Sequence, residues 1–87
     1  MKKQVLAAIH YIIKDNHAQA FSVIIISEML HINILEVNNC FKELVADRVI
    51  RKKYRFLNLY MATPDGIQII KDAVSETDKE GESVGVE

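Results

Sequence analysis

Apolar residues recur along the first third of this chain with the spacing of buried helix faces. A first helix is predicted over about residues 2–16, and its apolar face would comprise Val5, Leu6, Ile9, Ile12 and Ile13. Ser22 precedes an apolar run and has the short polar side chain that caps helix N-termini, so it predicts the start of a second helix. In that helix, Ile26, Met29 and Leu30 are expected to form the buried stripe.

A third helix is predicted over about residues 34–47, with Asn33 as its N-terminal cap. Its apolar residues again follow a spacing of three and four. The expected buried face comprises Ile34, Val37, Phe41, Leu44 and Val45. The single cysteine, Cys40, is expected to be a small core residue rather than a nucleophile.

The pattern then changes from the helical period to the alternation of β-strands. Residues 49–54 interleave apolar and basic side chains, and residues 57–62 alternate as a half-buried strand does. Only Arg55 and Phe56 separate the two runs, which predicts a hairpin with a two-residue tip.

The sequence TPDG predicts the start of a last helix, which would run to about residue 75. Thr63 can cap it, Pro64 suits its first position, and an acidic side chain follows near the positive helix end. Ile67, Ile70 and Val74 can cover the core, which leaves Ile69 and Ala73 as a surplus pointing elsewhere.

Charge divides the chain into two parts, although the net charge of the 87 residues is only −1. Residues 1–75 carry ten Lys or Arg against seven Asp or Glu, a net +3, whereas residues 76–87 carry one Lys against five acids, a net −4. The acidic segment has no aromatic residue and no periodic apolar pattern, so it is expected to be a disordered tail behind a single domain at residues 1–75.

Composition argues against several functional classes. One cysteine permits no internal disulfide and suggests a reducing, cytoplasmic setting, and no apolar run approaches the length of a membrane span. The three histidines and the cysteine do not have zinc-site spacing, and the three glycines form no phosphate loop. We therefore expect neither an enzyme nor a protein with a metal or other cofactor.

The stretch FSVIIISEMLHINILEVNNCFKELVADRVIRKK resembles the winged helix-turn-helix superfamily. A capped second helix ends in Leu30, His31 and Ile32, Asn33 caps the next helix, and VADRVI resembles its exit into the wing. YMATPDGIQII resembles the start of the C-terminal helix in small bacterial, phage and archaeal members. The resemblance covers about residues 2–75 and implies an α+β, mainly α fold: a three-helix core, a short β-hairpin wing and a C-terminal helix.

The sequence departs from the superfamily pattern at two positions that usually hold glycine. His31 occupies the turn and Arg48 precedes the wing. Either position can require a left-handed backbone, which costs a non-glycine residue of the order of 1 kcal/mol. The predicted two-residue tip would also reach less far than a typical wing.

The resemblance implies a DNA-binding transcriptional regulator that grips double-stranded DNA with its third helix and its wing. A basic cluster in VADRVIRKKYR would hold phosphates through Arg48, Arg51, Lys52, Lys53 and Arg55. Candidate base contacts on the third helix are Asn38, Asn39 and Lys42, and Leu35 could touch a thymine methyl. At the start of the first helix, Lys2 and Lys3 are further phosphate candidates.

Two other interpretations stay open at this point. The third helix carries three acids against Lys42, a net −2 over residues 34–47, and a basic edge strand often serves only to remain solvated. The alternative function is a winged-helix protein-interaction module, an adaptor or inhibitor that binds no nucleic acid. In either case the surplus apolar residues of the first and last helices suggest a homodimer or a protein partner.

Overall fold

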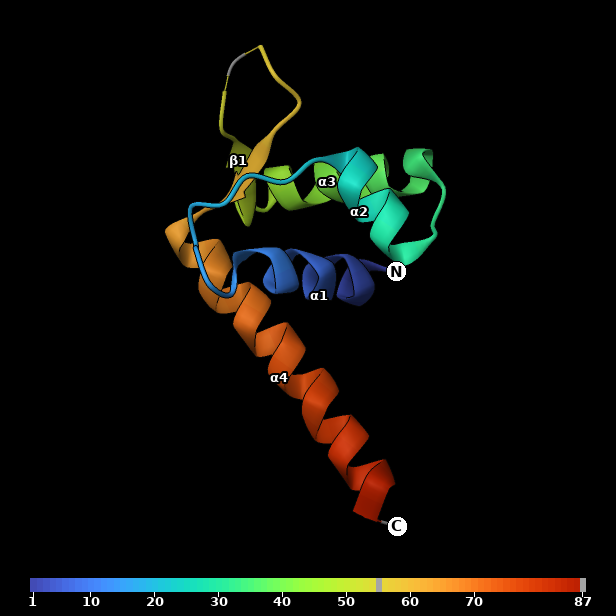
Figure 1. The fold of residues 1–87 in the computed structure, drawn as a ribbon. Helices are drawn as coiled ribbons and strands as arrows, with labels where there is room; N and C mark the ends of the chain where they lie inside the picture. Colours follow the sequence, from blue (N-terminus) through green and yellow to red (C-terminus); the bar gives the residue numbers. More distant parts are fainter. Residues whose placement is uncertain (55, 87) are drawn as a thin grey trace.

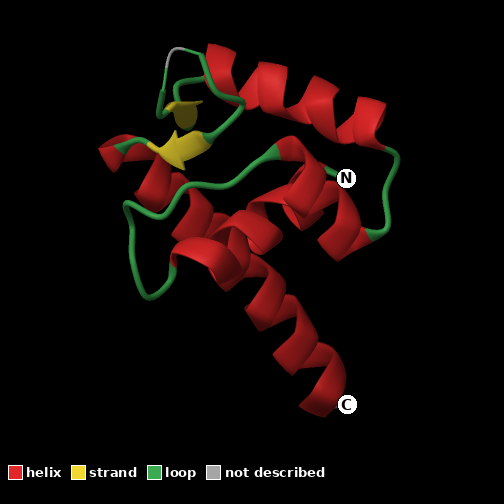
Figure 2. Cartoon of the chain, turned by 45° about the horizontal axis from the view of Figure 1, so that its top comes forward, coloured by secondary structure: helices red, strands yellow, loops and turns green. Residues whose placement is uncertain are grey.

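Four helices and a two-stranded antiparallel hairpin make up the fold (Figures 1 and 2). The computed structural model describes residues 1–54 and 56–86, and the surroundings of side chains as far as residue 75. In chain order the elements are α1 (Lys2–Ile13), α2 (Val23–Leu30), α3 (Ile34–Ala46), β1 (Ile50–Lys52), β2 (Tyr60–Ala62) and α4 (Pro64–Val86). The predicted fold class, mainly α with a hairpin, is confirmed.

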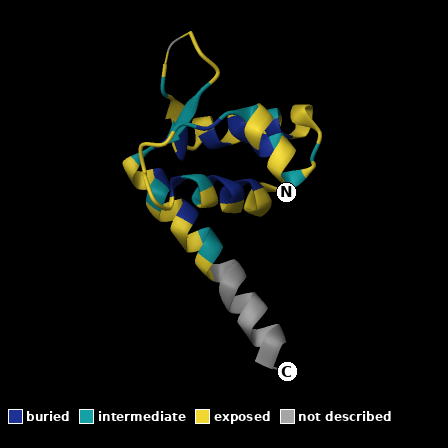
Figure 3. Cartoon of the chain, viewed as in Figure 1, coloured by how far each residue is buried: buried dark blue, intermediate teal, exposed yellow. Residues whose placement is uncertain are grey.

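The helices form two levels with the core between them. α2 and α3 lie on one level, α1 and the first turns of α4 lie on the other, and the hairpin projects from the side of α2 and α3 (Figure 1). Buried residues line the facing sides of these helices (Figure 3). α1 packs against α4, α2 and α3, and is therefore the central support of the helix pair that presents the candidate site.

Three aromatic rings join the hairpin to the helices. The rings of Phe21 and Phe41 meet edge to face with centroids 5.9 Å apart, and Phe41 meets Tyr60 in the same way at 5.0 Å. Phe21 also forms a backbone bridge with Tyr60, in which each N–H donates to the other carbonyl at 2.9 and 2.8 Å. The segment before α2 is therefore bonded to the hairpin at this one bridge.

Side-chain caps define where three helices begin, as the sequence predicted. The Ser22 hydroxyl accepts from the Ile25 N–H at 3.2 Å, and Asn33 Oδ1 accepts from the Leu35 N–H at 2.8 Å. Thr63 Oγ1 accepts from the Gly66 N–H at 2.9 Å at the start of α4. α1 ends at Ile13, three residues before the predicted end.

Both glycine replacements in the superfamily pattern do adopt left-handed backbone. His31 has φ 55° at the end of α2, and Arg48 has φ 61° between α3 and β1. In the first turn the Ile32 N–H donates to the Ser27 carbonyl, and the Ser27 hydroxyl donates to the Ile32 carbonyl. In the second turn the Val49 N–H donates to the Leu44 carbonyl. The expected strain at these two positions is therefore present in the backbone.

The hairpin differs from its prediction, because its strands are shorter and its tip is longer. Ile50, Arg51 and Lys52 pair with Ala62, Met61 and Tyr60. One further backbone bond joins the Lys53 N–H to the Leu59 carbonyl at 2.8 Å, which leaves five residues, not two, beyond the last bonded pair. The strand that was predicted to alternate apolar and basic residues ends at Lys52. The wing extends well beyond the helices (Figure 1).

Several predicted core residues are exposed. Ile34 and Val45 on α3 and Met29 on α2 lie in solvent, whereas α3 buries Val37, Cys40, Phe41 and Leu44. Positions 34 and 45 lie near the ends of α3 and to one side of that stripe. Cys40 is buried in the core, as predicted.

The prediction for the last helix also needs correction. Ala73 packs against the core and is not part of an outward surplus, whereas Ile69 is exposed as expected. The assigned helix continues to Val86 rather than ending near residue 75. The predicted acidic tail, residues 76–87, lies outside the residues whose side chains are described, and its disorder stays a prediction.

Candidate nucleic-acid interface

The outward face of α3 presents the predicted base-contacting residues. Asn39 and Lys42 are exposed, and Asn38 is half-buried at the edge of the same face. Leu35 lies one turn from Asn39 and two turns from Lys42, so these side chains form one strip along the helix. Because Val37, Phe41 and Leu44 anchor the opposite face in the core, the strip is held on a rigid support.

The acids near α3 do not occupy this strip. Glu36 and Glu43 are seven residues apart and therefore share a flank about 100° away from the line of Leu35 and Lys42. Asp47 is paired with Lys2, whose Nζ lies 3.4 Å from the carboxylate. Glu36 and Glu43 are three and four residues from Asn39, so both acids border the strip beside that residue. Lys2 is engaged within the molecule.

The basic residues of the hairpin fall into three groups. Arg48, Arg51 and Lys52 are exposed, and Ile50 is the buried residue of β1. Lys53 is half-buried, with its Nζ 3.4 Å from the Ala18 carbonyl and 5.6 Å from the Tyr54 ring centroid. Arg55 lies outside the described residues.

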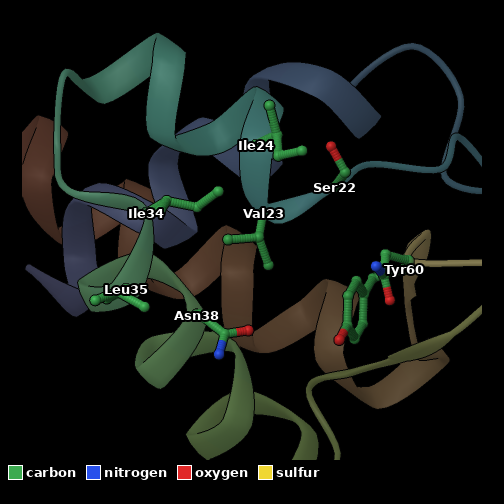
Figure 4. Close-up of a pocket in the computed structure, with 8 residues that line it drawn as sticks. Ser22, Val23, Ile24, Ile34, Leu35, Asn38 and Tyr60 are labelled. Carbon is green, nitrogen blue, oxygen red and sulfur yellow. The ribbon is translucent and has the colours of Figure 1, made fainter.

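A hollow of about 290 Å³ lies between the start of α2, the first turns of α3 and the wing. Its lining comprises Ser22, Val23, Ile24, Ile34, Leu35, Asn38, Asn58 and Tyr60. Val23 lies between the α3 side chains on one side and the Tyr60 ring on the other, and Asn38 borders the opening (Figure 4). No acidic or basic side chain is among these lining residues.

Sequence reasoning found the α3 residues but missed the contribution of α2 and β2 to this hollow. The sequence predicts Ser22 only as a cap, and Tyr60 as a strand residue that adds to the exposed apolar surface. The Val-Ile-Ile-Ile run at 23–26 could have indicated an exposed apolar surface on α2. One face of a helix cannot bury four consecutive apolar residues, and in this helix Ile26 is the buried one.

Other kinds of site find no support in the described residues. No group of three or more His, Cys, Asp or Glu side chains among them could hold a metal ion. No described helix is long and apolar enough to cross a bilayer.

Comparison with known proteins gives a structural match. No protein-family model matches the chain, and no curated protein does so. Among solved structures, the chain is similar to Lactococcus lactis ZitR, in its C30AH42A mutant in apo form, with a TM-score of 0.74 at 16% sequence identity. The superposition covers 97% of this chain and 61% of the ZitR chain, so this chain corresponds to about three fifths of that protein's length.

The chain has the winged helix-turn-helix fold. In this winged helix, α2 and α3 are the helix-turn-helix, α3 is in the recognition position, and β1 and β2 form the wing. The hollow therefore lies in the angle between the recognition helix and the wing, next to the start of α2.

Proposed function

We propose that this winged helix is a sequence-selective DNA-binding transcriptional regulator that acts without a cofactor. One observation carries the proposal: the exposed cations Arg51 and Lys52 lie on β1, which packs against α3, and the outward strip of α3 presents Lys42 with its acids at one border. A duplex presents phosphates on both sides of its major groove, so cations on the wing and on the reading helix complement it.

The roles divide between phosphate and base contacts. Arg48, Arg51 and Lys52 are free to meet phosphates, and Arg55 is proposed with them from its sequence position. Lys53 could join only by giving up its contact with the Ala18 carbonyl. On α3, Asn38 and Asn39 suit adenine, and Lys42 suits guanine acceptors.

Fluorescence anisotropy of a labelled random-sequence duplex at several salt concentrations tests the electrostatic part of this proposal. Each lost phosphate contact lowers the slope of log affinity against log salt by about 1. The double variant Arg51→Gln/Lys52→Gln should therefore bind more weakly, with a slope smaller by about 2. The matched control is Lys14→Gln/Lys71→Gln, which removes two cations that line a separate small hollow between α1 and α4.

The control should bind as the wild type does. Equal losses in both double variants would mean that net charge, not the wing, drives binding. Absence of binding at low salt would refute DNA recognition.

A protein-interaction module remains the second candidate, because large apolar side chains are exposed on the same face. Ile24 and Leu35 are 57% and 69% exposed, which is unusual for a surface that meets only water. If no duplex binds, this face becomes the proposed site of a protein partner, and a Leu35→Glu variant would disrupt that complex.

We also propose that the regulator is a homodimer through α1 and α4. Tyr11 on α1 and Ile69 on α4 are exposed apolar side chains that a second copy could cover. A two-fold dimer would place two recognition helices on two half-sites of one duplex.

A further inference from the structure

We infer that the hollow between α2, α3 and the wing reads thymine methyl groups, so that the preferred DNA is rich in A·T pairs at the position of Leu35 and Ile34. The inference rests on the proposed function and adds to it the class of sequence that is recognised. Leu35 and Ile34 would be the methyl contacts, and Asn38 would bond to a neighbouring adenine.

The starting observation is the apolar character of the reading surface at the N-terminal end of α3. Leu35, Ile24 and Ile34 all expose large parts of their side chains there, and Ile34 is 44% exposed. All three line the hollow, together with Val23 and the Tyr60 ring. Recognition helices place their N-terminal residues against base edges, and Ile34 and Leu35 are the first two residues of α3.

The major groove offers few apolar partners for such side chains. Base edges there present hydrogen-bond donors and acceptors, and the thymine C5-methyl group is the apolar exception. Leu35 facing a G·C pair would leave donors and acceptors dehydrated and without partners, which is unfavourable. Leu35 facing a thymine methyl would bury apolar surface from both molecules.

Polar groups near the hollow fit the same ligand. Asn38 borders the hollow, and an asparagine amide can bond to both the N6 and N7 positions of adenine. The Ser22 hydroxyl and the amide of Asn58 are uncharged, whereas the cations Lys42, Arg51 and Lys52 lie outside the lining. The hollow thus has a largely apolar, uncharged lining, and exposed cations occur on α3 and β1, two of the elements beside it. An uncharged apolar lining suits a groove floor that lies between two rows of phosphates.

The test uses a duplex obtained by selecting tight binders from a randomised library with the full chain. Replacing its thymines one at a time with deoxyuridine removes the methyl group and leaves base pairing intact. At one or two positions wild-type affinity should fall about fourfold for each methyl group lost from an apolar contact. All other replacements should leave affinity unchanged.

Two variants assign the effect to the hollow. Leu35→Ala should bind the thymine duplex more weakly and should no longer distinguish thymine from deoxyuridine at the sensitive position. Met29→Ala, which trims an exposed apolar residue of α2 outside the hollow lining, should keep the full discrimination. Leu35 is largely exposed, so its truncation should leave the fold intact, and circular dichroism checks this.

The outcomes separate this inference from the proposed function. Tight, salt-dependent binding with no deoxyuridine effect at any position would overturn methyl reading and leave DNA recognition standing. Selection of a G·C-rich motif would do the same. Failure to bind any duplex would overturn both and favour a protein partner for the apolar face.

Discussion

His31 and Arg48 carry the backbone strain of this winged helix, since they are the described non-glycine residues with positive φ. Each ends a helix at the point where the chain must reverse, His31 in the turn of the helix-turn-helix and Arg48 before the wing. Gly66 shows the opposite situation, because a Cβ there would lie 1.8 Å from the Val49 carbonyl oxygen. At that position the close approach of α4 to the Val49 carbonyl requires glycine, whereas the two left-handed positions merely favour it.

Arg48→Gly should therefore stabilise the protein, because glycine adopts φ near 60° without the Cβ penalty. We expect the free energy of unfolding to rise by about 1 kcal/mol, measured by urea denaturation followed by circular dichroism. Arg51→Gly, which removes the same charge from β1, should lower it by about 0.5–1 kcal/mol. If both substitutions destabilise to a similar extent, the left-handed backbone at Arg48 is not costly.

At the scale of elements, Thr63 connects three of them through one hydroxyl. Its Oγ1 donates toward the carbonyls of Arg48 (2.6 Å) and Val49 (3.2 Å), and it accepts from the Gly66 N–H. This hydroxyl thereby ties together Arg48 after α3, Val49 before β1 and the start of α4. This explains why a short hairpin with three residues in each strand can hold a defined orientation beside the recognition helix.

Removing that hydroxyl tests the connection. Thr63→Val keeps the branched shape but leaves the Gly66 N–H and the Arg48 carbonyl without their partner, so the free energy of unfolding should fall by about 1–2 kcal/mol. Thr63→Ser, which keeps the hydroxyl, should remain within about 0.5 kcal/mol of the wild type. Thermal denaturation of the two variants measures the difference, and equal stabilities would show that the cap contributes nothing.

At the scale of the whole molecule, the proposed DNA-binding surface and the proposed dimer surface lie on different levels of the fold. The recognition helix, the wing and the hollow belong to the level of α2 and α3, and the exposed apolar residues of α1 and α4 belong to the other (Figure 3). A dimer through α1 and α4 would leave the proposed DNA-binding face open.

The proposed dimer predicts a specific change in mass. Light scattering after gel filtration should give twice the chain mass for the wild type, and the monomer mass for Tyr11→Glu/Ile69→Glu, because charged side chains cannot be buried in the interface. Leu57→Glu, which alters an exposed apolar residue of the wing, should remain dimeric. A monomeric wild type at high protein concentration would rule the dimer out, and dissociation by Leu57→Glu would move the interface to the wing.

The sequence by itself determined the features that depend on a few neighbouring residues. Three helix starts could be predicted from Ser22, Asn33 and Thr63, because a capping side chain bonds to an N–H only two or three residues away. His31 and Arg48 stood where the superfamily pattern has glycine, and both proved left-handed. The order of helices, hairpin and helix followed from apolar periodicity in the same local way.

Only the tertiary structure decided the features that depend on distant parts of the chain. Tyr60 pairs with Phe21, 39 positions earlier, as well as with Lys52 across the hairpin, and so joins the segment before α2 to the wing. Which side of α3 is buried depends on where α1 and the aromatic rings lie, so periodicity alone misplaced Ile34 and Val45. The hollow draws residues from α2, α3 and the wing, and a one-dimensional pattern holds no information about how three separate segments meet.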